Sequence, residues 1–97
     1  MTFSSTTEIT VEHQPSRDRL DELQVADWPI WAKDVSTFPW TYDEAETCYL
    51  LEGEVVVTPT GGSPVTVARG DLVRFPAGMS CTWDIRSAVK KHYRFGD

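Results

Sequence analysis

Short stretches of alternating apolar and polar residues dominate the chain from Trp28 onward. They are rich in Val, Thr, Tyr, Phe and Trp, and turn sequences such as TGGSP and PAG separate them. Short strands divided by turns in this way are typical of a β-sandwich or a small antiparallel β-barrel. We predict a tight turn at Glu52–Gly53 and strands near residues 29–35, 38–42, 46–51, 54–58, 65–68, 71–75, 81–86 and 88–95.

The N-terminal part of the chain follows a different pattern. Residues 8–13 (EITVEH) alternate and predict one short strand, whereas residues 15–25 form the one convincing helical stretch. Ser16 is the expected N-cap of that helix, which is too short to take part in a helical bundle. We therefore expect an all-β fold in a single domain over 1–97, with an arm and a short helix at 1–27 and a β-barrel at 28–97.

Composition narrows the class of protein. The chain has 97 residues, 40% of them hydrophobic, which suits one compact domain. A formal net charge of −6 repels nucleic acid and anionic membranes, and no apolar run approaches the roughly 20 residues of a membrane span. The start MTFSSTTEITVEH has no pattern of a secretory signal, and two cysteines are too few for a disulfide scaffold. We expect a cytoplasmic protein that binds neither nucleic acid nor membranes.

Two of the predicted strands carry reactive or polar side chains on one face. Alternation places each set on a single side of its strand: Glu46, Cys48 and Leu50 on one, and Cys81, Trp83 and Ile85 on the other. In a small barrel one face of every strand points inward. The two faces are therefore expected to converge in the interior.

Two spaced motifs surround these strands. Glu46 is followed after six residues by Gly53, and Gly70 is followed after five residues by Pro76-Ala-Gly78. Together they resemble the two signatures of the cupin superfamily, in frame over residues 40–85. DWPIW, CYLLEGEV, GDLVRFPAG, CTW and VKKHY are similar to the small DUF861 (Cupin_3) branch, which includes the (S)-ureidoglycine aminohydrolases. The resemblance implies a cupin-type, jelly-roll-like antiparallel β-barrel.

The same resemblance indicates where a metal would bind. In metal-binding cupins the ligands are two histidines and a glutamate of the first motif and a histidine of the second. Here Trp40, Tyr42 and Cys81 stand at the three histidine positions, and Glu46 alone is kept. An indole nitrogen does not ligate a metal and a neutral tyrosine ligates it poorly, so we expect no metal and no other cofactor.

Lys91 is an unexpected residue on the last strand. By alternation it shares a face with Val89, Tyr93 and Phe95, although a buried lysine is costly unless it is paired. A β-bulge that turns the side chain outward, or a stem that reaches the rim, is the alternative. We predict that Lys91 points inward and forms an ion pair with Glu46 in the place that a metal takes in other cupins.

The cysteines and histidines outside this pair receive simpler interpretations. We predict two reduced cysteines, of which Cys48 is most simply a small buried hydrophobe and Cys81 is the more accessible. His13 lies in the terminal strand. His92 alternates with Lys90 and Arg94, so it is expected at the surface.

Three hypotheses about function remain open. The first is a metal-independent small-molecule-binding cupin whose pocket is formed by Trp40, Tyr42, Glu46, Cys48, Cys81, Trp83 and Lys91. The second is an enzyme acting on a small ureide- or amino-acid-like metabolite, an expectation from family resemblance. Its candidate catalytic groups are Glu46 as acid or base, Lys91 as charge partner or imine former and Cys81 as nucleophile. The third is a structural or regulatory module with a filled barrel. A homodimer through the N-terminal strand is also expected.

Overall fold

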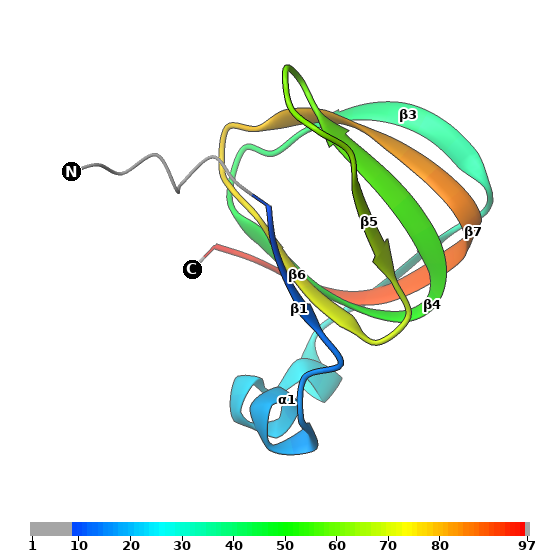
Figure 1. Ribbon diagram of the computed structural model, residues 1–97. Helices are drawn as coiled ribbons and strands as arrows, with labels where there is room; N and C mark the ends of the chain where they lie inside the picture. The colour runs from blue at the N-terminus through cyan, green and yellow to red at the C-terminus, as the bar shows by residue number, and fades with distance from the viewer. Residues whose placement is uncertain (1–8, 97) are drawn as a thin grey trace.

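The computed structural model describes residues 9–96, which form one antiparallel sheet of seven strands and one α-helix. The prediction of an all-β fold with a short N-terminal helix is confirmed. Figure 1 shows the helix below a folded-over sheet. In chain order the elements are β1 (Thr10–His13), α1 (Arg17–Leu23), the 3-10 turn η2 (Val25–Asp27), β2 (Ile30–Lys33), β3 (Ser36–Thr41), β4 (Glu46–Pro59), β5 (Val65–Ala68), β6 (Asp71–Phe75) and β7 (Ser80–Phe95).

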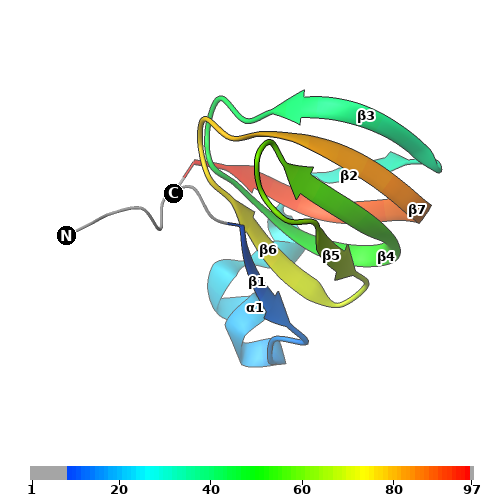
Figure 2. The same ribbon diagram turned by 45° about the horizontal axis from the view of Figure 1, so that its top comes forward.

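Two long strands, β4 and β7, pair with each other and belong to both halves of the fold. The first part of β4 pairs with β6 and its later part with β5. The first part of β7 pairs with β3 and its later part with β2. The sheet therefore folds into two facing layers, β1-β6-β4-β7-β2 and β5-β4-β7-β3 (Figure 2). Within residues 9–96 no ladder joins β2 to β3, so the expected barrel is open along that edge.

The predicted tight turn at Glu52–Gly53 is wrong, because β4 continues through it. The ladder with β7 shifts register between Leu50 and Val55, as β-bulges do, and the strand bends from one layer to the other. Gly53 has φ 97°, and a Cβ there would collide with the carbonyl oxygens of Ser87 and Ala88 on β7. Likewise, the two strands predicted at 81–86 and 88–95 are one bent strand.

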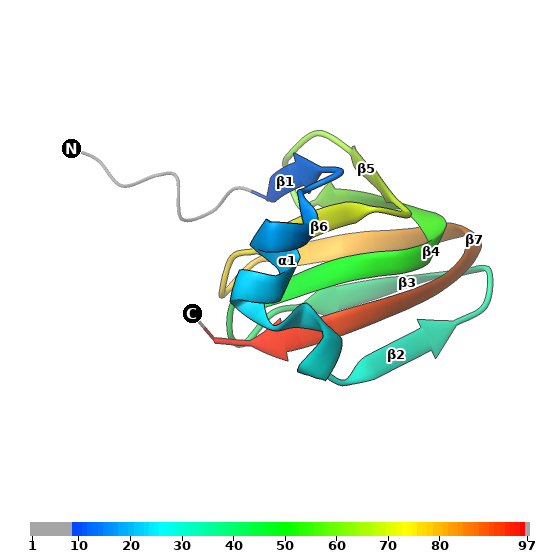
Figure 3. The ribbon, with the colours of Figure 1, turned by 90° about the horizontal axis from the view of Figure 1, so that it is seen from below.

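The N-terminal segment packs outside the two layers. Ser16 Oγ accepts the backbone N–H of Arg19 at 3.1 Å, so the predicted N-cap of α1 is confirmed. Beneath the sheet α1 crosses β6 and β4 (Figure 3). The contact is a small second core of Val25, Trp28 and Leu72, with Leu20, Leu23 and Tyr49 against it. Over residues 9–96 no helix is long and apolar enough to cross a membrane.

The strand predicted at the N-terminus pairs with its own chain. In β1, Thr10 to His13 lie opposite Arg74 to Asp71 of β6. Its proposed role in a homodimer remains a prediction.

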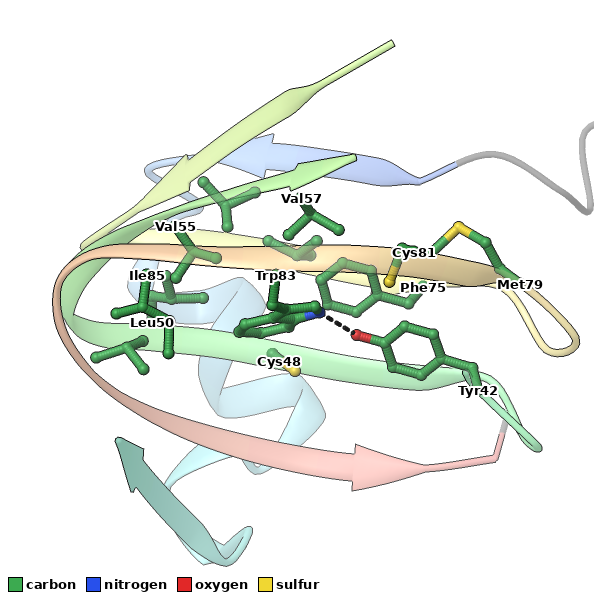
Figure 4. Close-up of a cluster of buried hydrophobic side chains, with 13 residues drawn as sticks. Tyr42, Cys48, Leu50, Val55, Val57, Phe75, Met79, Cys81, Trp83 and Ile85 are labelled. Carbon is green, nitrogen blue, oxygen red and sulfur yellow. Dashed lines mark hydrogen bonds between the residues drawn. The ribbon is translucent and has the colours of Figure 1, made fainter. Parts of the chain in front are cut away.

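The main core fills the space between the layers. Its apolar part is the valine cluster, defined as Val55, Val57, Val67 and Ile85, all with no exposed surface. Figure 4 shows Val55 and Ile85 toward one end of the core and Tyr42 and Phe75 toward the other, with Trp83 between them. The rings of Tyr42 and Phe75 are stacked, with centroids 4.9 Å apart. Tyr42 and Trp83 also line the candidate site.

Candidate functional site: a lysine–glutamate pair under an aromatic pocket

A polar cluster lies on the inner face of the layer that contains β6 and β2. Lys91 Nζ on β7 donates to Glu46 Oε2 on β4 at 2.9 Å, and both side chains are about one-twentieth exposed. The predicted ion pair is therefore present. It forms because alternation points both residues inward and because β4 pairs with the later part of β7, where Lys91 lies opposite Leu50. The sheet thus brings together two charges that are 45 positions apart in the sequence.

Cys48 completes this polar cluster, which we define as Glu46, Cys48 and Lys91. Its thiol donates to Glu46 Oε2 at 3.1 Å and accepts from Lys91 Nζ at 3.2 Å. Burial raises the pKa of the Cys48 thiol well above its usual range. Burial alone lowers the pKa of Lys91, but Cys48 and Glu46 together raise that pKa above its usual value. Lys91 is therefore a protonated donor at neutral pH.

Aromatic rings surround the ammonium group of Lys91. Nζ lies 4.9 Å from the ring centroid of Trp31 on β2 and 4.7 Å from that of Trp83 on β7. The two indoles meet edge to face, with centroids 6.1 Å apart. A desolvated cation at these distances is attracted by the negative faces of the rings. Glu46 and the two indoles therefore stabilise Lys91 in the interior together.

Tyr42 links the polar cluster to the core. Its hydroxyl accepts the Trp83 Nε1–H at 3.0 Å, which is the dashed line in Figure 4. Burial, with the nearby charge of Glu46, raises the pKa of Tyr42 far above its usual range, so the phenol stays neutral. Tyr42 is only 2% exposed. The phenol is therefore a buried, uncharged part of the pocket wall.

A cavity of about 220 Å³ opens above these residues. Glu46 and Lys91 are its two charged lining groups among the described residues, and the others are aromatic. The rings come from β2, β3 and β7, and Tyr42 lies just beyond the end of β3. They are Trp31, Phe38, Trp40, Tyr42, Trp83, Tyr93 and Phe95.

Not every residue expected in the site lines this cavity. Trp40, Tyr42, Glu46, Trp83 and Lys91 do, whereas Cys48 and Cys81 do not. Cys48 lies behind the ion pair with no exposed surface.

Cys81 is 4% exposed and packs in the main core. Both thiols are free. Cys81 is slightly more exposed than Cys48, as predicted. Burial raises the pKa of the Cys81 thiol, which leaves it protonated and a poor nucleophile.

Four lining residues were missed in the sequence: Trp31, Phe38, Tyr93 and Phe95. Phe38 lies two residues before Trp40, and Tyr93 and Phe95 lie two and four residues after Lys91. Strand alternation therefore places these three on the same face as predicted site residues, and it could have identified them. Trp31 had none, because its place depends on β2 pairing with β7, where it lies opposite Lys91.

The histidines lie away from the cavity. His13 Nδ1 is 2.9 Å from Asp71 Oδ1. His92 was expected at the surface, but it is half-buried and its Nδ1–H donates to the backbone oxygen of Trp28 at 2.8 Å. The reason is that Trp28, which directly follows η2, lies against β7, where the Arg94 guanidinium is 4.9 Å from its ring centroid.

The residues of this chain do not fit the metal that the fold implies. Lys91 already donates to Oε2 of Glu46 and so supplies a positive charge beside the carboxylate that a metal would need. Trp40 offers no ligand atom, Tyr42 is neutral, and Cys81 is a protonated thiol. Across residues 9–96 no group of three or more His, Cys, Asp or Glu side chains is placed to hold a metal ion. Glu46, the carboxylate that would ligate a metal, is thus held in an internal ion pair with Lys91.

Comparison with known proteins identifies the family. Residues 20–93 match the family model Cupin_3, described as the EutQ-like cupin domain. The fold is similar to that of a DUF861 family protein from Thermotoga maritima, with a TM-score of 0.88 and 48% identity over 91% of this chain and 99% of that one. No curated protein matches the chain significantly.

Longer relatives share the domain. A putative ethanolamine utilization protein Q from Salmonella typhimurium is 28% identical, with a TM-score of 0.63 over 69% of this chain and 54% of that one. A DUF861 protein from Pseudomonas syringae is 30% identical, with a TM-score of 0.62 over 68% of this chain and 28% of that one. The chain therefore spans about half of the first protein and less of the second. The match over most of its length shows that the chain belongs to the Cupin_3 family of EutQ-like cupin domains.

Proposed function

We propose that this cupin binds a small organic molecule in the aromatic pocket and that binding needs no metal. The observation that carries the proposal is the buried ion pair of Lys91 and Glu46 at the base of an open cavity. A pocket with apolar walls and a few convergent polar groups is typical of a small-molecule site. In this proposal Lys91 supplies the positive charge that a metal supplies elsewhere in the superfamily.

The cavity argues against the alternative of a filled structural module. The valine cluster is fully packed, whereas the space next to Glu46 and Lys91 is an open cavity. Trp40 and Phe95 at this site are about half exposed, at 47% and 50%. Large aromatic side chains left at a pocket rim are expected where they contact a ligand.

The alternative of an enzyme loses support from two of its three candidate residues. Cys81 lies outside the cavity lining and is a protonated thiol. Lys91 is protonated and paired, so its nitrogen lacks the free electron pair that imine formation requires. Glu46 alone remains available for acid–base chemistry. Binding without catalysis is therefore the function that we propose.

The experiment is a fragment screen by ligand-observed NMR on protein treated with EDTA. We expect fragments that bind equally well before and after treatment. Trp40→Ala should weaken them about two- to tenfold, because it removes one aromatic wall. Ile30→Ala is the matched control, since Ile30 is 52% exposed and lies outside the cavity lining. The proposal fails if no fragment shows saturable binding, or if binding disappears with the metal.

A further inference from the structure

We propose that the ligand is a small, planar, uncharged aromatic compound carrying an amide-type group, in which a hydrogen-bond donor lies next to an acceptor. This inference rests on the proposed function of the pocket and adds the chemical class of its ligand. Three features of the cavity carry it: the balance of its two charges, its unused hydrogen-bonding atoms, and the size and chemistry of its walls.

The two charges of the cavity cancel each other. Lys91 Nζ and Glu46 Oε2 are 2.9 Å apart, and both side chains are almost fully buried. An anionic ligand at this floor gains little from a cation that is already paired and meets the charge of Glu46. A cationic ligand meets Lys91 between its two indoles. Since charges interact strongly in a dry site, either sign is disfavoured relative to an uncharged ligand.

Two hydrogen-bonding atoms remain unused. The Tyr42 hydroxyl accepts from Trp83, but its own hydrogen has no acceptor within the part of the chain that the structure describes. Glu46 Oε2 receives both hydrogen bonds to this carboxylate, which leaves Oε1 without a protein donor in residues 9–96. No fully buried side-chain oxygen in that range lacks a partner, so Oε1 keeps some exposed surface, and the cavity is the space that Glu46 lines. The floor therefore presents a donor from Tyr42 and an acceptor from Glu46.

An amide-type group matches this pair of atoms. Its carbonyl accepts the Tyr42 O–H, while its N–H donates to Glu46 Oε1. A site with buried polar groups selects strongly for ligands that satisfy them, because an unpaired buried group is costly.

The walls and the volume select the rest of the ligand. An apolar cavity of about 150 Å³ is sufficient for benzene. The present cavity, at about 220 Å³, has room for one ring and one further small group. Phe38 and Trp83 are already stacked with an interplanar angle of 16°, and Trp40 stands edge-on to Tyr42. Aromatic walls of this kind favour a flat aromatic body.

The test uses three probes of nearly equal shape: benzamide, which is neutral, benzoate, which is an anion, and benzamidine, which is a cation. Their affinities are measured by NMR titration at pH 7.5 with EDTA present. We expect benzamide to bind at least tenfold more tightly than either charged probe. If benzoate or benzamidine binds as tightly as benzamide, the inference is wrong.

Two variants test the assigned atoms. Tyr42→Phe keeps the ring and removes the hydroxyl, so benzamide affinity should fall about two- to tenfold. Tyr49→Phe is the matched control, because Tyr49 packs against the outer core beneath α1 and should leave affinity unchanged. Equal affinities of the Tyr42→Phe variant and the wild type would overturn the assignment. Lys91→Met leaves Glu46 unpaired and should reverse the preference toward benzamidine.

The fold of each variant is checked by circular dichroism, and if Lys91→Met does not fold, Tyr42→Phe decides the assignment. The outcomes also separate this inference from the proposed function. If the fragment screen finds ligands but benzamide is not among them or is not preferred, the ligand class is wrong and the binding function stands. If neither the screen nor the three probes shows saturable binding, both are wrong.

Discussion

The interior holds two clusters of opposite character on the same two strands. The valine cluster takes Val55 and Val57 from β4 and Ile85 from β7, and its side chains have no exposed surface. The polar cluster takes Glu46 and Cys48 from β4 and Lys91 from β7 and lies below an open cavity. One half of each strand lies at the valine cluster and the other half at the polar cluster. Both paired strands bend near Gly53 of β4, where they pass from one layer to the other. We expect one half of the interior to provide stability and the other to provide the ligand recognition that we propose.

The sharpest way to break this comparison is to unpair the polar cluster. Lys91→Met or Glu46→Gln alone should cost about 3–5 kcal/mol of unfolding free energy, because each leaves one buried polar or charged group unmatched. The double variant should recover much of that loss while changing ligand binding. Urea unfolding of all four proteins gives the coupling energy. A coupling near zero would mean that the pair is not a stabilising unit.

A substitution in the valine cluster should act on stability alone. Ile85→Ala removes fully buried methyl groups and should cost about 2–5 kcal/mol by leaving a cavity. Ligand affinity of the folded variant should stay as in the wild type, since Ile85 does not line the cavity. Urea unfolding and an NMR titration of the same sample measure both quantities. A loss of affinity comparable to that of Trp40→Ala would show that the two clusters do not act separately.

Alkaline pH should affect the polar cluster and its neighbour Tyr42. Their folded-state pKa values are raised above ordinary values of 9.0 for Cys48, 10.0 for Tyr42 and 10.5 for Lys91. As pH rises the unfolded chain releases these protons first, so the stability contribution is complete below about pH 9 and falls progressively above it.

Urea unfolding between pH 7 and pH 11 measures this decline. Cys48→Ala should make it shallower at its start by removing one of the titrating groups. Ile85→Ala is the control and should lower stability by a similar amount at each pH. Constant stability up to pH 11 would contradict the assigned direction of the shifts.

Chelation should have the smallest effect. Because Lys91 pairs with Glu46, the carboxylate that a metal would use, EDTA should change neither the melting temperature nor fragment binding. Elemental analysis of freshly purified protein should find well below one equivalent of Mn, Fe, Ni or Zn. A stoichiometric metal whose removal unfolds the protein would show that Glu46 has another partner.

Strand alternation predicted the inner residues of the site well. Glu46, Cys48 and Lys91 all point inward, because the side-chain period of a strand is two and short segments cannot drift from it. The same rule correctly placed Trp83 in the interior.

Residues whose position depends on long-range pairing were harder to predict. Trp31 reaches the cavity through the pairing of β2 with β7, which no local pattern reveals. Gly53 was misread because a positive φ serves a bulge as well as a turn. Cys81 occupies a motif position, but in this chain its inward side chain joins the core next to Met79.

The sharing of β4 and β7 between the layers also has a consequence for folding kinetics. Neither layer is a separable unit, so unfolding is expected in one cooperative transition without an intermediate that keeps one layer intact. The strands that pair are distant in sequence, as Glu46 opposite Phe95 illustrates. Chain closure over such distances must precede most stabilising contacts, so folding should take milliseconds to seconds, as in other small β proteins. The bend that separates the valine cluster from the polar cluster in the native state thus joins the two halves into a single kinetic unit.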